Sequence, residues 1–231
     1  MSPISGEGAR HRQTMTPDIR IIGSYASPYV RKVLAVLEIK GLRYEIDPIV
    51  PFMGDDRFTA VSPLRRVPVL IDDRVTLPDS SVICQYLEDR YPSPALYPSD
   101  VADRARARWL EEFADSRMGD VFIWGLFNQA VIGPRVWGKP TDLQAIDRLV
   151  GKDIPGVLDY LERELPAAGF LFGAPAVADV AIATFFRNAA FARYSVDAQR
   201  WPVTAAFVDR VLAQDCLTKL QAYEVLMLRT S

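Results

Sequence analysis

Histidine is the scarcest chemically useful residue in this sequence. Among 231 residues there is one, His11, close to the N-terminus. A Ser-His-Asp triad, a Cys-His pair or a histidine-ligated zinc within a folded core is therefore excluded. The phosphate-cradling patterns GxGxxG and GxxxxGKS/T are also absent. Whatever chemistry the chain carries must run without imidazole.

Cysteine is almost as scarce, since Cys84 and Cys216 are the only two. Two cysteines so far apart in the sequence cannot provide the framework of a disulfide-stabilised fold. Both lie in apolar helical patterns, which predicts small core residues.

Neither charge nor hydrophobicity is concentrated enough to indicate a nucleic-acid or membrane partner. The 27 basic and 29 acidic side chains give a net charge of −2, which argues against non-specific nucleic-acid binding. No apolar run reaches the roughly 18 residues of a membrane span. The opening stretch MSPISGEGARHRQTMTP lacks the apolar core of a secretory signal. We expect residues 1–17 to be a disordered leader, with residues 1–14 either native or an extension before Met15, and the protein to be cytoplasmic.

What the sequence does contain begins with a small α/β unit. The chain is 49% hydrophobic and 24% charged, which is enough apolar mass for a globular core. Residues 18–23 are rich in isoleucine and end in glycine, which predicts a strand. A helix is expected next, because Ser27 suits the N-cap, Pro28 the first helical position and Gly41 the residue past its end.

Five further elements complete this unit, in the order strand, helix, strand, strand, helix. Their ranges are 44–47, 55–61, 67–71, 74–77 and 79–91. A strand–helix–strand start requires a parallel pair with a right-handed crossover. The tight Asp-Asp turn between the later strands requires an antiparallel pair. We therefore expect a small mixed sheet covered by helices.

The rest of the chain has a helical pattern. Three prolines between residues 91 and 98 end the preceding helix and predict a linker over residues 92–102. Helical periodicity then covers 103–128, 141–165, 177–193, 203–212 and 223–228. We expect two domains, an α/β domain at 18–91 and an all-helical domain at 103–231.

Four local patterns follow one another along the chain. Ser27-Pro28-Tyr29 opens the first helix, SPLRRVPVL at 62–70 resembles NPxxKVPxL, DSSVICQYL at 79–87 resembles ESxAIxxYL, and GAPAVADVA at 173–181 resembles the helix start SIADxA. Together they make the chain similar to the glutathione transferase superfamily. The resemblance implies a thioredoxin-like N-terminal domain, a helical-bundle C-terminal domain, a homodimer and glutathione as co-substrate.

The resemblance gives Val67-Pro68 a specific role. Proline has no N–H and is rare within a strand. In the superfamily this proline is cis, which turns the backbone of Val67 outward to pair with the cysteinyl part of glutathione. A trans proline on an edge strand is the plainer alternative. Arg66 falls on the family's basic position and is expected to hold the glycyl carboxylate, unless it is a solvated surface arginine.

Asp79-Ser80 lies where a strand ends and a helix begins. Ser80 and the first-turn N–H groups form an anion site, and Asp79 can accept from an ammonium, so the pair suits the γ-glutamyl end of glutathione. An ordinary helix cap is the alternative. The family usually has Glu or Gln where Asp79 stands, which leaves its reach to the ligand open.

Ser27 is the expected catalytic residue, with Tyr25 and Ser24 as backup donors. Its hydroxyl and the positive end of the helix would stabilise the thiolate of glutathione. Capping alone is the other interpretation. Arg31 and Lys32 follow in the first turn, where the helix dipole disfavours cations. They are expected to be solvated on the surface, or else relieved by a nearby anion.

The second domain departs from the family at one position. Asp179 is expected to have a structural role, but Ala176 replaces the usual Ser or Thr at the N-cap, so half of the capping box is missing. Aromatic side chains at helical spacing either line an apolar co-substrate pocket or belong to the core. They are Trp109, Phe113, Phe122, Trp124 and Phe127.

These expectations lead to a serine-type glutathione transferase that adds glutathione to an apolar electrophile, needs no metal and acts in detoxification. Two alternatives stay open. One is a glutathione-dependent isomerase or dehalogenase, and the other is a non-catalytic binding module that keeps the fold.

Overall fold

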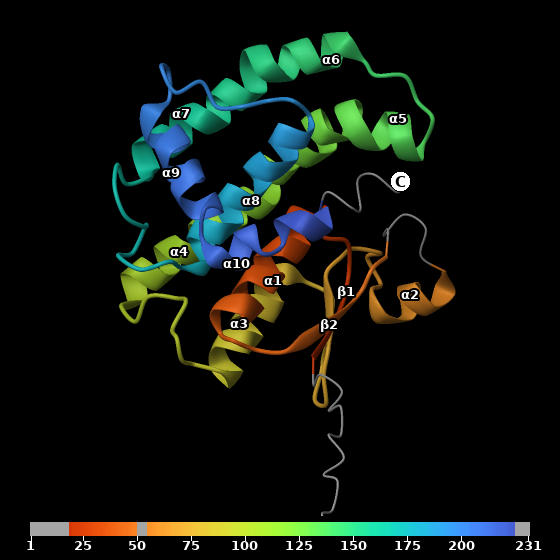
Figure 1. Ribbon diagram of the computed structural model, residues 1–231, viewed down its shortest axis with the longest axis vertical. Coiled ribbons are helices and arrows are strands. Elements are labelled where there is room, and N and C mark those ends of the chain that lie inside the picture. Colours follow the sequence, from red (N-terminus) through yellow and green to blue (C-terminus); the bar gives the residue numbers. More distant parts are fainter. Residues whose placement is uncertain (1–18, 50–54, 225–231) are drawn as a thin grey trace, which may run out of the picture.

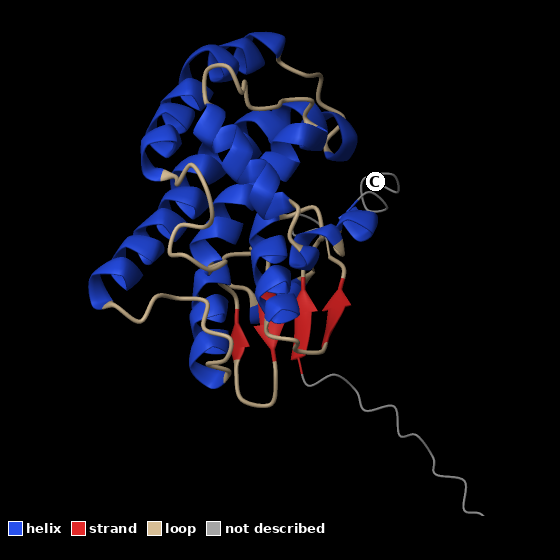
Figure 2. Cartoon of the chain, turned by 60° about the vertical axis from the view of Figure 1, so that its left-hand side comes forward, coloured by secondary structure: helices blue, strands red, loops and turns tan. Residues whose placement is uncertain are grey.

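The structure is a computed structural model that describes residues 19–49 and 55–224 of the 231. Within this part, a four-stranded sheet lies at one end of the molecule and helices make up the remainder (Figure 2). The predicted leader at 1–17 and most of the predicted last helix at 223–228 lie outside the described residues.

The sheet has the strand order β2-β1-β3-β4. Its central strand β1, Ile19–Ile22, pairs in parallel with β2, Tyr44–Asp47, and antiparallel with β3, Val69–Ile71. Strand β4, Thr76–Leu77, pairs antiparallel with β3. The predicted mixed sheet is therefore confirmed, although β3 starts only after Pro68, and β4 is shortened to the two residues that pair with Leu70 and Ile71.

Helices cover both faces of the sheet. The crossover helix α1, Pro28–Ile39, and α3, Ser80–Arg90, lie on one side, and the short α2, Asp56–Val61, lies on the other (Figure 1). The side chains of β1 alternate accordingly. Ile21 belongs to the main core, whereas Ile22 packs with Phe58 of α2. This alternation with period two places α1, and with it the candidate site, on the face that meets the rest of the chain.

The C-terminal part is all-helical, as predicted. It contains α4 Val101–Phe113, the π-type helix η2 Ala114–Ile132, α5 Gly133–Val136, α6 Leu143–Arg148, the π-type turn η3 Leu149–Asp153, α7 Ile154–Glu164, α8 Val177–Phe191, α9 Pro202–Leu212 and α10 Asp215–Thr218. The first of these helices begins at Val101, inside the predicted linker, because Asp100 accepts from two first-turn N–H groups and caps it.

Helix α8 joins the two parts of the molecule. It packs against α1 as well as against α4, η2 and α9 (Figure 1). The buried residues of both parts form one continuous hydrophobic cluster, in which Val33 and Leu34 of α1 and Ile182 and Phe185 of α8 all belong. The domain boundaries at residues 91 and 103 remain a prediction, since a continuous core marks no boundary.

Candidate functional site

Ser27 is the N-cap of α1, as predicted. Its backbone is extended, Pro28 follows at the first helical position, and its Oγ accepts from the N–H of Val30 at 3.4 Å. At the other end of the helix, Gly41 takes a φ of +64°, the left-handed conformation expected just past a helix. In this cap hydrogen bond the hydroxyl oxygen accepts, so it leaves the O–H of Ser27 available to donate.

A tight turn brings the chain from β1 to this cap. The N–H of Ser27 donates to the carbonyl of Ser24 at 3.0 Å, and Ser24 Oγ accepts from the N–H of Ala26 at 3.2 Å. Ser24, Tyr25, Ala26 and Ser27 are all half-buried, so the turn has one face toward solvent. The three candidate donors therefore lie together on one four-residue turn.

The segment before β3 runs beside this turn. Ile22 pairs with Val69, so continuing the antiparallel register places Gly23 and Ser24 opposite Pro68 and Val67. A Cβ on Gly23 would lie 2.6 Å from a methyl group of Val30 and 3.5 Å from Cβ of Val67. Glycine is required at position 23 because only a residue without a side chain allows this close approach. The Val67–Pro68 peptide bond is cis, as the resemblance implies.

Arg66 is exposed, and its backbone is fixed by a buried serine. Ser62 Oγ accepts from the N–H of Arg66 at 3.0 Å and donates to its carbonyl at 2.8 Å. Ser62 is fully buried. The guanidinium therefore projects from an anchored backbone, and its pairing with a carboxylate stays a prediction.

Asp79 is the N-cap of α3. Its Oδ1 accepts from the N–H groups of Ser81 and Val82, both at 3.0 Å. Ser80 is the first helical residue and is buried. The capping interpretation is thus confirmed for Asp79, while the binding of a γ-glutamyl group by Asp79 and Ser80 stays a prediction.

Lys32 joins the N-terminal turns of the two capped helices. Its Nζ donates to Ser81 Oγ at 3.0 Å, to Glu111 Oε1 at 2.9 Å and to Asp115 Oδ2 at 2.5 Å. The side chain of Lys32 is 1% exposed. The expectation of a solvated cation on the surface was wrong, because two acids of the helical part lie within reach. Burial would lower the pKa of Lys32, but Asp115 and Glu111 overcome this effect and raise it.

The carboxyl of Asp115, which pairs with Lys32, is itself largely removed from water. Desolvation raises its pKa, and the attraction of Lys32 offsets the rise only in part. Its backbone carbonyl also accepts from the hydroxyl of Tyr29 at 3.0 Å. Helix α1 is thereby held to η2 by one charged and one neutral contact next to the candidate site.

Arg31 is also buried, so the solvated interpretation was wrong here too. Its guanidinium donates to the carbonyl of Tyr25 at 3.1 Å, to the carbonyl of Thr184 at 2.7 Å and to Asn188 Oδ1. Its Nε faces Glu224 at 3.8 Å, too far for a hydrogen bond. Burial lowers the pKa of Arg31 to about 10, against the opposing influence of Glu224.

Tyr25 packs against the last described residues of the chain. Its ring stacks on that of Tyr223, with centroids 5.0 Å apart and planes 16° apart. Burial raises the pKa of Tyr25, and Tyr223 and Glu38 add to this effect. A phenol that holds its proton more tightly is still a hydrogen-bond donor, but its ring is already part of the packing.

Both cysteines and two of the five aromatic residues named above are buried in the core. Cys84 and Cys216 are free and buried, as predicted. Phe122 and Phe127 lie in the core, whereas the side chains of Trp109 and Trp124 are about half exposed. In residues 19–49 and 55–224, no cluster of three or more His, Cys, Asp or Glu side chains is placed to hold a metal ion.

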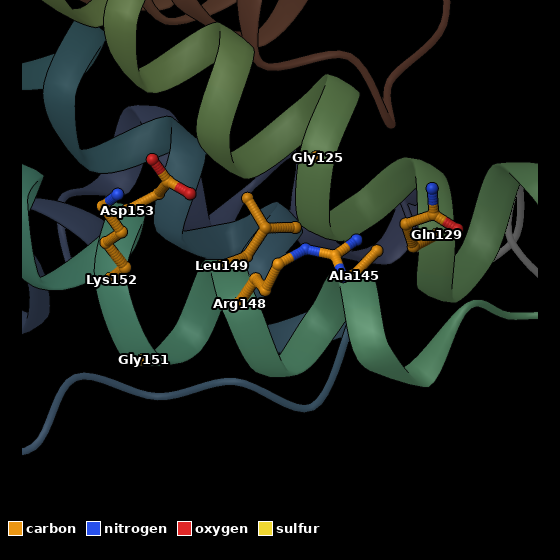
Figure 3. A pocket seen from close by; sticks show the side chains of 8 residues that line it. All are labelled: Gly125, Gln129, Ala145, Arg148, Leu149, Gly151, Lys152 and Asp153. Carbon is orange, nitrogen blue, oxygen red and sulfur yellow. The ribbon is translucent and has the colours of Figure 1, made fainter.

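A surface pocket of about 490 Å³ lies between η2 and the α6–η3 segment (Figure 3). Leu149 points toward the helix that carries Gly125, where an added Cβ would lie 2.9 Å from its methyl group (Figure 3). Arg148, Lys152 and Asp153 contribute the charged part of the lining. The pocket contains none of the predicted site residues, so it is separate from the turn at Ser27.

Asp179 has the structural role expected of it. It is fully buried, its Oδ2 accepts from the N–H of Ala176 at 2.9 Å, and its Oδ1 accepts from the N–H of Leu171 at 2.9 Å. Ala176 is the N-cap of α8 and has no side-chain oxygen. Half of the capping box is therefore present, as predicted.

Comparison with known proteins agrees with this architecture. Residues 21–95 match the family described as Glutathione S-transferase, N-terminal domain. The maleylacetoacetate isomerase of Pseudomonas aeruginosa PAO1 is 32% identical over 186 residues, which are 77% of this chain and 84% of that protein. The uncharacterized GST-like protein YibF of Escherichia coli K12 is 31% identical over 150 residues, which are 64% and 70% of the two chains.

A solved glutathione S-transferase from Rhodospirillum rubrum F11 superposes with a TM-score of 0.79 at 25% identity, over 87% of this chain and 91% of that one. The chain therefore belongs to the glutathione S-transferase family, whose members use glutathione. The thioredoxin-like fold followed by a helical domain is confirmed. Among the described helices, none is both long and apolar enough to cross a membrane.

Proposed function

We propose that this protein is a glutathione transferase that ionises the thiol of glutathione beside Ser27 and adds it to an electrophilic small molecule. The observation that carries the proposal is the position of Ser27. Its hydroxyl caps α1 through a long hydrogen bond, on a half-exposed turn that runs beside Val67–Pro68. The thiol is that of glutathione, which members of this family use.

The chemistry assigned to Ser27 is electrostatic. Its hydroxyl donates to the sulfur of glutathione, and the N-terminus of α1 adds a positive potential. Both favour the thiolate, so the thiol loses its proton to water near neutral pH. The thiolate then forms a carbon–sulfur bond with the electrophile, and any leaving group departs with its electron pair. Ser27 forms no covalent bond in this sequence of steps.

The remaining groups bind the tripeptide. We assign the backbone of Val67 to the cysteinyl residue, Ser80 and the start of α3 to the γ-glutamyl carboxylate, and Asp79 to its ammonium. Arg66 pairs with the glycyl carboxylate. Support comes from the positions of these groups, since Val67 precedes the cis proline that leads into β3, and Lys32 joins the start of α3 to α1.

A second function, isomerisation with glutathione as a cofactor, is favoured by the match to the maleylacetoacetate isomerase. In that reaction the thiolate adds to a double bond, rotation follows, and the thiolate is expelled again. Product therefore forms with no net loss of glutathione. Following glutathione and product together in one assay separates this reaction from conjugation.

We propose further that the protein is a cytoplasmic homodimer with domain boundaries near residues 91 and 103, and that its conjugation activity serves detoxification. The support is the family membership together with the helical start at Val101. Analytical ultracentrifugation tests the dimer, and a single monomeric species would refute it.

The central test measures binding and ionisation separately. Calorimetry with glutathione gives the affinity, and ultraviolet absorbance of the thiolate against pH gives the thiol pKa in the complex. Ser27→Ala should keep binding, raise this pKa and lower kcat by roughly ten- to a hundredfold, as expected for losing a hydrogen bond to a charged group. Ser24→Ala tests whether the backup donor on the same turn contributes to the ionisation.

Two outcomes would overturn the assignment. Full turnover in Ser27→Ala would remove Ser27 from the catalytic role. Absence of glutathione binding by the wild-type protein would instead favour a non-catalytic member that keeps only the fold.

A further inference from the structure

The turn that carries Ser27 has two carbonyl groups that point into the protein. The carbonyl of Tyr25 accepts from Arg31 at 3.1 Å, and the carbonyl of Ala26 accepts from Asn188 Nδ2 at 2.9 Å. These are the two central residues of the turn closed by the hydrogen bond from Ser27 to Ser24. Both of these carbonyl groups therefore accept hydrogen bonds from buried side chains.

The two donors act as a pair. Asn188 Oδ1 accepts from the guanidinium of Arg31, while its Nδ2 donates to Ala26. Because Arg31 can only donate and a carbonyl can only accept, these partners fix the orientation of the amide uniquely. Asn188 is fully buried, and Arg31 is 1% exposed. Both groups are therefore shielded from water.

The donors come from different parts of the fold. Arg31 stands in the first turn of α1, and Asn188 stands on α8, in the helical part that packs against α1 (Figure 1). A second acceptor on α8, the carbonyl of Thr184, accepts at 2.7 Å from the same guanidinium nitrogen that donates to Asn188. The conformation of the turn is thus set from α8, 162 residues away in the sequence.

The direction of these carbonyls matters for an anion outside the turn. A carbonyl oxygen carries partial negative charge, and one that faced solvent here would repel a thiolate approaching Ser27. Arg31 and Asn188 keep both oxygens on the buried side. The hydroxyl of Ser27 and the N-terminus of α1 are then the polar groups presented to a ligand on the solvent side.

We propose that Asn188, acting with Arg31, is a positioning residue that holds the carbonyls of Tyr25 and Ala26 inward, so that the Ser24–Ser27 turn favours a bound thiolate. This inference rests on the proposed function, because the thiolate is that of glutathione. Asn188 touches neither ligand nor reacting atoms. It acts through the backbone of the turn.

The test compares three variants of the full-length protein. Asn188→Ala removes both contacts, and Asn188→Asp keeps an acceptor for Arg31 but turns a carboxylate oxygen toward Ala26. In both, the thiol pKa of bound glutathione should rise by about 0.5 to 1, which lowers the thiolate fraction below that pKa roughly three- to tenfold. The expected kinetic signature is a lower kcat with little change in KM for glutathione, because the tripeptide contacts are untouched.

Thr184→Val is the matched control. It is fully buried on the same helix, its hydroxyl bonds only the local carbonyl of Ala181, and its backbone carbonyl remains available to Arg31. Thr184→Val should lower stability without moving the thiol pKa. A change in the pKa as large as that in the Asn188 variants would show a general packing effect and overturn the proposal.

Amide hydrogen exchange of Ser27 without glutathione tests the positioning separately. The exchange should be faster in both Asn188 variants, because the turn loses its inner anchor. An unchanged pKa and an unchanged exchange rate in folded variants would overturn the inference, as would a failure of both variants to fold. If wild-type protein leaves glutathione un-ionised, the proposed function fails, and the exchange rates still decide whether Asn188 holds the turn.

Discussion

Lys32 Nζ donates to Ser81 Oγ at 3.0 Å, and this hydrogen bond joins the N-terminal part of α1 to the first turn of α3. Ser81 Oγ is in turn 2.8 Å from both Glu111 Oε1 and Asp115 Oδ2. A cation in the first turn of a helix opposes the helix dipole. Here the two acids from the helical part compensate it, so one buried ammonium joins α1 to α3, α4 and η2 beside the candidate site.

Replacing this ammonium should be strongly destabilising. Lys32→Met keeps the length of the side chain but leaves Glu111, 2% exposed, and Asp115, 17% exposed, without their cation. Breaking a buried ion pair by removing one partner lowers the free energy of unfolding by about 3 to 5 kcal/mol. Urea unfolding followed by circular dichroism measures the loss.

Lys219→Met is the control for this prediction. Lys219 pairs with Glu38 at 3.2 Å but is 62% exposed, so its loss should lower the free energy of unfolding by less than about 1 kcal/mol. Equal effects of the two substitutions would show that the buried network contributes no more than a surface pair.

Asp79 has two possible duties, and one substitution separates them. Asp79→Asn keeps a good N-cap, so the free energy of unfolding should change by only a few tenths of a kcal/mol. It removes the charge that we assign to the ammonium of glutathione. The dissociation constant should therefore rise by roughly five- to tenfold, as for losing a charge-assisted hydrogen bond. Calorimetry with glutathione measures it.

The chain offers a matched control in Asp100. This residue caps α4 in the same way, accepting from the N–H groups of Ala102 at 2.9 Å and Asp103 at 3.0 Å. Asp100→Asn should leave glutathione affinity unchanged. If Asp79→Asn also leaves it unchanged, Asp79 is a helix cap and nothing more.

Tyr25→Phe asks whether Tyr25 is the donor in place of Ser27. The substitution keeps the ring that stacks on Tyr223 and removes only the hydroxyl. Turnover and the thiol pKa of bound glutathione should stay at their wild-type values, while Ser27→Ala changes both. A loss in Tyr25→Phe equal to that in Ser27→Ala would transfer the donor role to Tyr25.

The local parts of this fold were predictable from the sequence. The starts of α1 and α3 were predicted from the capping residues that directly precede them, Ser27 and Asp79. The glycine at the end of β1 follows from the same kind of short pattern, whereas the cis bond before β3 was implied by the resemblance to the family. Capping and strand alternation involve neighbouring residues, so a single sequence contains the information.

The interactions behind the site were not predictable in this way. Lys32 meets Glu111 79 residues away, and Arg31 meets Asn188 157 residues away. The sequence contained one signal, two cations in the first turn of a helix that has no acid there. That conflict indicates a partner but cannot identify it, because the partner depends on how α4, η2 and α8 lie beside α1.

Asp179 should make the stability of the protein depend on pH. Burial raises its pKa from 3.8 to about 6, against the opposing effect of its two backbone hydrogen bonds. Between these values the folded state binds a proton that the unfolded state lacks, so stability falls as pH rises, by about 3 kcal/mol across the window. Asp179→Asn should remove this component of the pH dependence.

Glu162→Gln is the control, and its effect on the pH dependence of stability should have the opposite sign. Hydrogen bonds from Val203 and Thr204 outweigh burial and lower the pKa of Glu162. The midpoints of urea unfolding, measured from pH 4 to 7, give the pH dependence of stability for each variant. Parallel curves for wild type and Asp179→Asn would contradict the prediction.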